Sequence, residues 1–377
     1  MSDYLNLVDF LEPVNTALIS DDLGYKEGQV GKVISVFDEG FPDLDAAQIV
    51  LVGCGEQRGA GLRGTSTAPD AIRKAFYSLY YWHNDVQIAD IGNVKTGSSL
   101  ADSYAALKIV LRELMGIGKR VVVLGGSHDL TLAQYYAFAA DEKAIEAVGV
   151  DAVVDIHIDS PQRADNFLME LLTAEPNFMT HYNHLAFQSY FVHPRMLETM
   201  DKLRFDCFRV GTVKEHLEEM EPVIRNCHLL SFDIAAFAHA FAPATRLSPN
   251  GLNGEEACTL MQYAGMSPHL QCLGIYGFVP EQDPSGLTAM QVAHMLWYLL
   301  DGCSRGAREV GLDERDHFNE FHTMFAEVDT VFLQSKRTGR WWMQLPDERF
   351  IACSHRDYQQ AANNDIPERW LRAQERP

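Results

Sequence analysis

Basic residues are scarce in this chain of 377 residues: 31 lysines and arginines stand against 52 aspartates and glutamates, which gives a formal net charge of −21. This excess of negative charge disfavours nucleic acid and anionic membrane surfaces as partners, because both are negatively charged themselves. No apolar run reaches the roughly 20 residues that span a bilayer, and the N-terminus lacks a basic stretch before an apolar core. We therefore expect no nucleic-acid partner and no membrane association.

Paired cysteines are also missing. The seven cysteines include no Cys-x-x-Cys pair and are odd in number. Several lie in apolar stretches, where a free cysteine behaves as a small hydrophobic residue. This pattern favours a reducing cytoplasm over a disulfide scaffold. Internal repeats, low-complexity segments and flexible linkers are absent as well, whereas 47% of the residues are hydrophobic, which is enough for a large core.

What the sequence does contain is an alternation of apolar strand-like runs with amphipathic helical patterns. Uninterrupted apolar strands are typical of a parallel sheet that helices cover on both faces. We expect a lead-in over residues 1–45, one α/β domain over 46–302 and an extension over 303–377 that packs on the same domain. The clearest strands are expected at 48–53, 86–92, 120–124, 152–158, 203–211, 227–237 and 270–276, and the clearest helices at 70–77, 99–116, 254–265 and 288–300.

A glycine-rich loop, residues 54–64, follows the first of these strands. Gly53-x-Gly55 begins like a dinucleotide-binding fingerprint, but Gly59 comes one residue too late and the loop before the next helix is too long. We therefore interpret the segment as a loop beside a substrate pocket rather than as a nucleotide site.

The segment 155–159 reads Asp-Ile-His-Ile-Asp at the end of an apolar run. If it is a strand, Asp155, His157 and Asp159 project from the same face. Burying two carboxylates and an imidazole is costly unless a cation binds them. Oxygen and imidazole ligands suit manganese, zinc or iron(II). A solvent-exposed polar edge is the alternative explanation of this strand when it is considered alone.

Two further polar residues favour the metal interpretation. His128 follows the run 120–124 after a pair of glycines, and Asp233 lies inside the apolar run 227–237. Open α/β sheets place their ligands beyond the carboxyl ends of the strands. We therefore predict that His128 and Asp233 meet the segment 155–159 at one edge of the sheet.

Three of these segments resemble stretches of the ureohydrolase family of arginases, agmatinases and formimidoylglutamases. Residues 125–129, Gly-Gly-Ser-His-Asp, resemble the family's GGDHS stretch with serine and aspartate exchanged, and residues 155–159 match its DxHxD stretch. Residues 231–235, Ser-Phe-Asp-Ile-Ala, resemble its SxDxD stretch. With the tail Arg340-Trp-Trp-Met343, the sequence is most similar to the bacterial formimidoylglutamase-like branch. The resemblance implies a three-layer αβα sandwich with a doubly wound, mostly parallel sheet of about eight strands.

The resemblance also implies a metal site and an activity. Family members usually bind two manganese ions, and by analogy His128, Asp155, Asp159 and Asp233 would hold one ion. His157 would hold the other, with Asp155 and Asp233 as bridges. Asp159 would be the catalytic residue that helps to move a proton. The implied reaction is hydrolysis of a linear amidine C–N bond by a metal-activated hydroxide, with N-formimidoyl-L-glutamate giving glutamate and formamide.

Departures from the family pattern qualify this expectation. Ala235 replaces the second acid of SxDxD, so we expect one tightly bound Mn2+ and a second ion that is weak or absent. Gly277 stands where arginases and agmatinases carry a glutamate that binds the guanidinium, so arginine and agmatine should be poor substrates. These departures leave open a degenerate family member with an impaired second site that acts as a binding or interaction protein.

Several assignments stay open at this level. The carboxylates of the substrate have three candidate partners, Arg58, Arg63 and Arg163. The proton-shuttling histidine of the family has two candidate matches, His181 and His184. The expected partner is a small-molecule amidine, and assembly into a homo-oligomer is left open.

Overall fold

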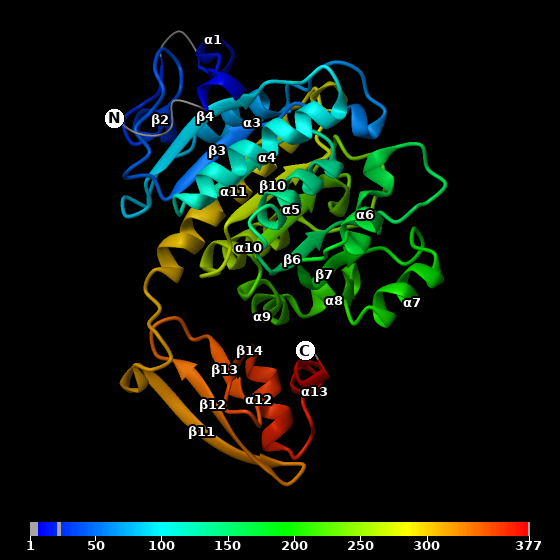
Figure 1. Ribbon diagram of the computed structural model, residues 1–377. Coiled ribbons are helices and arrows are strands. Elements are labelled where there is room, and N and C mark those ends of the chain that lie inside the picture. Colours follow the sequence, from blue (N-terminus) through cyan, green and yellow to red (C-terminus); the bar gives the residue numbers. More distant parts are fainter. Residues whose placement is uncertain (1–6, 21–23, 376–377) are drawn as a thin grey trace.

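The computed structural model describes residues 7–20 and 24–375, and its strands form two sheets (Figure 1). The first sheet comprises β1 (Leu11–Glu12), β2 (Ser35–Val36), β3 (Ile49–Gly53), β4 (Ile88–Val94), β5 (Arg120–Leu124), β6 (Ile145–Val150), β7 (Met179–Phe187), β8 (Asp206–Arg209), β9 (Leu229–Asp233) and β10 (Cys272–Tyr276). The second comprises β11 (Phe318–Phe325), β12 (Val328–Ser335), β13 (Trp341–Gln344) and β14 (Phe350–Cys353).

The first sheet has the strand order β1-β4-β3-β5-β10-β9-β6-β7-β8, with β2 paired to β4. All neighbours from β4 to β8 in this order are parallel, whereas β1 is antiparallel to β4. These eight mutually parallel strands and the reversal of strand order confirm the predicted doubly wound, mostly parallel sheet.

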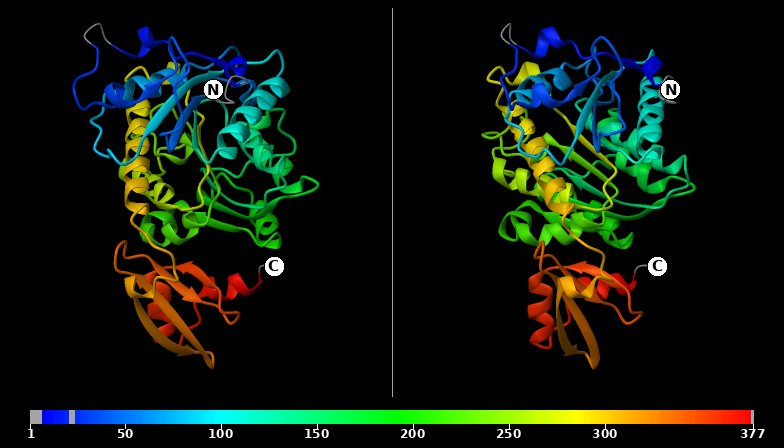
Figure 2. Two further views of the ribbon diagram at one scale, coloured as in Figure 1. Left: turned by 60° about the vertical axis from the view of Figure 1, so that its left-hand side comes forward. Right: turned by 90° about the vertical axis from the view of Figure 1, so that its left-hand side faces the viewer.

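Helices cover both faces of this sheet (Figure 2). Helices α3, α9, α10 and α11 contribute to the hydrophobic cluster on one face, and α4, α5, α6 and α7 to the cluster on the other. The helices are α1 (Thr16–Ile19), α2 (Val30–Val33), α3 (Ala68–Tyr77), α4 (Leu100–Gly116), α5 (Thr131–Ala139), α6 (Phe167–Thr173), α7 (Pro194–Lys202), α8 (Val210–Glu215), α9 (Met220–Arg225), α10 (Gly254–Met266), α11 (Leu287–Gly306), α12 (His355–Ala362) and α13 (Glu368–Glu375).

The second sheet belongs to a separate C-terminal unit that follows α11 and includes α12 and α13 (Figure 1). Strands β11 to β14 are antiparallel neighbours in chain order. This unit has its own hydrophobic clusters, to which Trp341 and Trp342 contribute. The C-terminal region therefore folds as a unit with its own sheet and its own hydrophobic core.

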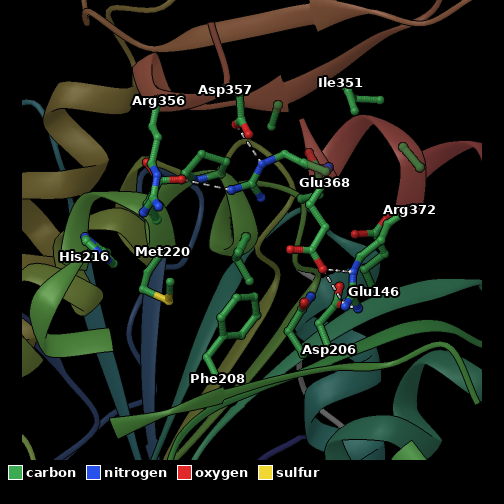
Figure 3. A pocket seen from close by; sticks show the side chains of 18 of the residues that line it. Glu146, Asp206, Phe208, His216, Met220, Ile351, Arg356, Asp357, Glu368 and Arg372 are labelled. Carbon is green, nitrogen blue, oxygen red and sulfur yellow. Dashed lines mark hydrogen bonds and ion pairs between the residues drawn. The ribbon is translucent and has the colours of Figure 1, made fainter. Parts of the chain in front are cut away.

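Charged side chains join the C-terminal unit to the larger α/β body. The buried Arg225 guanidinium of α9 lies 4.4 Å from the ring centre of Trp342 and donates to the carbonyl oxygen of Trp341 over 2.7 Å. A cavity of about 560 Å³ lies along this seam (Figure 3). Two of the four arginines that line it are paired across the seam, Arg369 with Glu219 and Arg372 with Asp206. The cavity is therefore lined by an ion-pair network that holds the two parts together.

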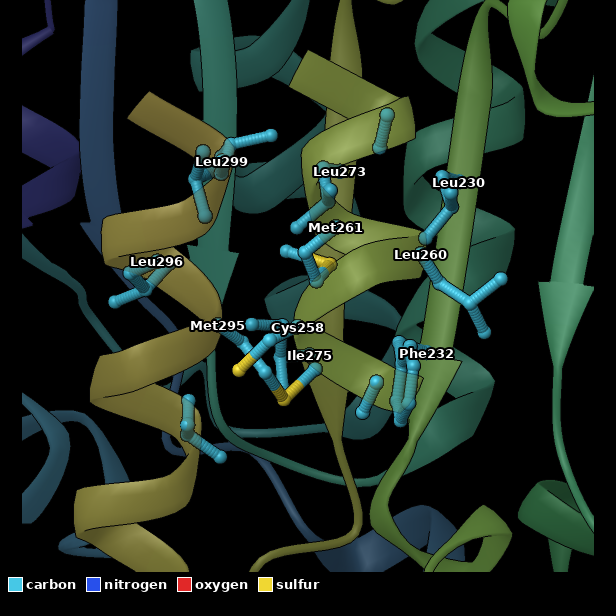
Figure 4. Packing of buried hydrophobic residues seen from close by; sticks show 14 of the residues in the cluster. Leu230, Phe232, Cys258, Leu260, Met261, Leu273, Ile275, Met295, Leu296 and Leu299 are labelled. Carbon is cyan, nitrogen blue, oxygen red and sulfur yellow. The ribbon is translucent and has the colours of Figure 1, made fainter. Parts of the chain in front are cut away.

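The core beneath the centre of the large sheet follows from strand alternation. Successive side chains of a strand point to opposite faces, so Val122 and Leu124 of β5 join one cluster while Val121 and Val123 join the other. On the first face, Leu273 of β10 packs with residues of α10 and α11 (Figure 4). These buried layers hold in place the strand ends that carry the polar residues described below.

Two regions differ from the sequence-based expectation. The polar and aromatic stretch 160–194 contains α6 and the buried strand β7, whose mixed sequence of histidine, asparagine and apolar residues hid the strand pattern. The expected strands and helices also omit the charged stretch 304–325, which contains the end of α11 and all of β11. In the lead-in, residues 1–6 and 21–23 lie outside the described residues, while β1 and β2 pair with β4.

Among the described residues, no helix combines the length and the apolar character needed to cross a membrane.

Candidate metal centre

The candidate centre lies at the carboxyl ends of β5, β6 and β9, close to the middle of the large sheet. After β5, Gly125 and Gly126 adopt positive φ angles of 82° and 80°, and a Cβ on Gly126 would lie 2.6 Å from the carbonyl oxygen of Cys54. Only glycine fits so tight a turn without strain. The turn places His128 in a short 3-10 helix above the sheet.

His128 faces three buried carboxylates. Its Nδ1 atom lies 3.0 Å from Asp151, 3.1 Å from Asp155 and 3.6 Å from Asp233, measured to one carboxylate oxygen of each. All four side chains are buried. Yet Nδ1 has no hydrogen-bond partner of acceptable geometry among the described residues. His128, Asp151 and Asp233 also bring one ligand atom each within 4.8 Å of one another, as a shared metal ion requires.

A chain of hydrogen bonds sets the tautomer of His128. Thr131 donates its hydroxyl proton to the carbonyl oxygen of His128 over 2.8 Å, so its oxygen accepts from Ser231 over 2.7 Å. Ser231 then has an oxygen free to accept from Nε2 of His128, 2.8 Å away. This leaves the lone pair of Nδ1 facing three carboxylates. A neutral imidazole in that position is stable only when a cation lies between it and the acids.

The pKa values of the cluster also indicate that a cation is needed to stabilise it. Burial and repulsion from neighbouring carboxylates raise the pKa of Asp151 to about 6 and that of Asp233 to about 7. Burial opposes charging of His128, but the close approach of the Asp151, Asp155 and Asp233 carboxylates raises its pKa well above the ordinary value. Without an ion, the cluster therefore retains protons. A divalent cation would replace them, and the residues present fit such an ion.

The strand predicted over 152–158 does not form, so the register assumed for the acidic motif does not apply. Strand β6 ends at Val150, and the segment after it is irregular because the Asp151 carboxylate accepts from the amide of Val153 over 3.2 Å. The face alternation assumed for 155–159 therefore does not apply. Asp151 and Asp155, rather than Asp155 and Asp159, therefore lie beside Nδ1 of His128.

Sequence reasoning missed Asp151, although the signal was present. Asp151-Ala-Val-Val-Asp155 has the same spacing between its acids as Asp155-Ile-His-Ile-Asp159, and it directly follows the buried run 147–150. The metal-binding motif was assigned to the second segment because that segment contains a histidine. In the register that the structure has, Val153 stands where the family motif has its histidine.

His157 and Asp159 lie outside the carboxylate cluster. Both line an open cavity of about 770 Å³ that begins at Asp155 and also contacts Val153 and Ala235. Neither Val153 nor Ala235 offers a ligand atom. Among the predicted ligands, the structure thus gathers His128, Asp155 and Asp233 and leaves His157 and Asp159 at the cavity wall.

The two candidate shuttle histidines lie on opposite halves of β7. His184 is paired in register with Gly149 near the end of β6, and it is fully buried. Its Nδ1 atom lies 3.2 Å from the hydroxyl of Tyr182, and burial lowers its pKa to about 4. His181 lies near the start of β7, with Nε2 3.1 Å from a carboxylate oxygen of Asp206. It is therefore remote from the cluster.

Gly277 carries no acid and has no room for one. Its φ angle is 80°, and a Cβ would lie 2.5 Å from a carboxylate oxygen of Asp233. Two of the three candidate arginines have partners already, since Arg58 binds the buried Glu56 and Arg163 binds Glu170. Arg63 is exposed and does not line the cavity.

Comparison with known proteins completes this description. The model of the Arginase family matches residues 47–301. Formimidoylglutamase from Vibrio cholerae is 24% identical over 301 residues, which cover 70% of this chain and 86% of the relative. Formimidoylglutamase from Salmonella arizonae is 35% identical over 120 residues, covering 30% of this chain and 38% of the relative.

Solved structures show the same fold at low identity. The formiminoglutamase of Trypanosoma cruzi, solved with Mn2+2, aligns with a TM-score of 0.65 at 17% identity, covering 74% of this chain and 99% of that one. The formimidoylglutamase of Bacillus subtilis aligns with a TM-score of 0.65 at 17% identity, covering 80% of this chain and 99% of that one.

Proposed function

The chain belongs to the arginase family, and from this premise we propose that it is a metal-dependent hydrolase of linear amidines that holds one divalent ion tightly. N-formimidoyl-L-glutamate is the leading substrate, with glutamate and formamide as products. The observation that carries the proposal is the Nδ1 atom of His128, which is buried, has no hydrogen bond to any described residue and faces three carboxylates. The named activities of the relatives support the substrate class.

The proposed ligands are His128, Asp151, Asp155 and Asp233. Manganese fits this set of one imidazole and three carboxylates, and it is the metal named for the Trypanosoma cruzi structure. A divalent ion at this position would supply Lewis acidity that lowers the pKa of water in the site. Because Val153 and Ala235 provide no ligand atom, we propose that a second ion is weak or absent.

The residues of the chain have three tasks in this mechanism. Ser231 and Thr131 hold His128 in the tautomer that exposes its lone pair to the ion. Asp155 belongs to the cluster and also lines the cavity, so it is placed to accept a proton from attacking water. We therefore propose Asp155, rather than Asp159, as the catalytic residue that helps to move a proton.

Substrate preference follows from Gly277. A guanidinium would find no carboxylate there, and a charge-assisted hydrogen bond of this kind contributes about 1.5–3 kcal/mol. Arginine and agmatine should therefore be poor substrates. We further propose a cytoplasmic protein, because its seven cysteines are all free.

The test is a hydrolysis assay on Mn2+-loaded protein with a panel of N-formimidoyl-L-glutamate, arginine and agmatine. Glutamate release from the first compound, with little turnover of the other two, is the expected result. The matched variants Asp155→Asn and Asp159→Asn decide the register, because only the first should abolish hydrolysis and metal retention. Metal binding without turnover of any amidine would favour the alternative of a binding protein.

A further inference from the structure

The open cavity beside Asp155 contains one arginine and no lysine among its lining residues. That arginine is Arg195, the second residue of α7. Its side chain is exposed, and it has no hydrogen bond or ion pair to any of the described residues. The lining of this cavity thus includes both Asp155 of the carboxylate cluster and Arg195, whose guanidinium has no partner among the described residues.

The acids that share this cavity do not neutralise Arg195. Asp155 belongs to the proposed metal ligands. Asp165 accepts a hydrogen bond from the hydroxyl of Ser160 over 2.5 Å. Asp159 is exposed and forms no ion pair among the described residues. The guanidinium of Arg195 is therefore available to bind a ligand.

From this arrangement we infer that Arg195 binds a carboxylate at the far end of the substrate and so selects linear amidines that carry one. This inference rests on the proposed function. It replaces the three arginines suggested by the sequence: Arg58 and Arg163 are bound to acids, and Arg63 lies away from the cavity. Arginine suits the task because its planar group donates two parallel hydrogen bonds to a carboxylate.

The kinetic consequence is specific. A contact at the unreactive end is made equally in the ground state and the transition state, so its loss raises KM and leaves kcat unchanged. Arg195→Gln should raise KM for N-formimidoyl-L-glutamate about tenfold to a hundredfold, the fold-change of one charge-assisted hydrogen bond. Hydrolysis of N-butylformamidine, which has no carboxylate, should be the same in both proteins.

Arg63→Gln is the matched control, because Arg63 is also an exposed arginine but does not line the cavity. It should leave KM for both compounds unchanged. A rise in KM with Arg63→Gln and none with Arg195→Gln would overturn the inference. So would an equal effect of Arg195→Gln on the two amidines.

A binding measurement separates this inference from the proposed function. N-formyl-L-glutamate differs from the leading substrate by one oxygen in place of the imine nitrogen. Calorimetry should show a Kd that Arg195→Gln raises about tenfold to a hundredfold and Arg63→Gln does not change. If no amidine is hydrolysed but this pattern holds, the proposed function fails and the carboxylate site stands. If N-formyl-L-glutamate does not bind, or binds both variants equally, the carboxylate site is refuted.

Discussion

At the scale of single residues, the centre depends on the orientation of one imidazole. His128 can offer a lone pair to a cation only while its Nε2 proton is directed at Ser231. Ser231 is itself buried and held by Thr131. Partners of this kind, which fix a ligand without touching the metal, typically change metal affinity tenfold to a hundredfold.

Ser231→Ala should therefore lower the affinity for Mn2+ by roughly tenfold to a hundredfold without preventing folding. Titration of the metal-free protein with Mn2+ measures the effect. The matched control is Ser304→Ala. Ser304 is also buried, but its hydroxyl bonds the carboxylate of Asp85, 2.7 Å away, and not His128. Equal Mn2+ affinities in the two variants would show that Ser231 does not orient His128.

A second residue-scale prediction concerns acid stability. Burial lowers the pKa of His184 to about 4 in the folded protein, whereas a histidine in the unfolded chain has a pKa near 6.5. The unfolded chain therefore binds this proton first on acidification, and stability is lost as the pH falls from about 6.5 to 4. His184→Gln should reduce this loss by about 3 kcal/mol.

Urea unfolding of both proteins at pH 7 and pH 4.5 measures that difference. His322→Gln is the control, because the side chain of His322 is 72% exposed. If the unaltered protein and His184→Gln lose the same stability between the two pH values, His184 does not remain neutral in the folded state.

At the scale of secondary structure, the sequence identifies strands well where they are continuous and apolar. The run 120–124 predicts β5 to the residue, because Val121 to Leu124 are apolar and buried on both faces of the sheet. Strand β7 was missed since its histidines and asparagine break that pattern. The end of β6 was misplaced because a side-chain bond from Asp151, rather than a glycine or proline, stops the strand.

Because β6 ends earlier than predicted, a second metal position would need different substitutions from those that the sequence suggests. Val153, after β6, and Ala235, after β9, stand where two ligands of a second ion would be expected. Val153→His together with Ala235→Asp should allow a second Mn2+ to be retained, because the two substitutions add an imidazole and a carboxylate beside Asp151 and Asp233. Metal analysis after dialysis should then show one more ion in the double variant than in Ala235→Asp alone; equal contents would contradict the new register.

At the scale of the whole molecule, two units are joined by buried charges. Arg225 lies between α9 and the C-terminal sheet, where it pairs with the buried Glu221 and stacks on Trp342. Removing one partner of a buried ion pair leaves an uncompensated charge and costs about 3–5 kcal/mol. The composition of the chain gave no indication of this seam, because its partners are distant in sequence.

Arg225→Ala should therefore lower the free energy of unfolding by about 3–5 kcal/mol. Urea unfolding monitored by tryptophan fluorescence measures this loss, since Trp341 and Trp342 lie at the seam. Arg305→Ala is the control, because its pair with Asp301 is half-exposed and such pairs contribute less than about 1 kcal/mol. A similar small effect of both substitutions would mean that Arg225 and its contacts with Trp341 and Trp342 do not hold the units together.

The account as a whole depends on one ion held by His128, Asp151, Asp155 and Asp233. The most direct test is the metal content of the purified protein, measured after loading with Mn2+ and exhaustive dialysis. We predict one ion per chain, lost in Asp155→Asn and retained in Asp159→Asn. Two tightly retained ions per chain, or none, would contradict the account.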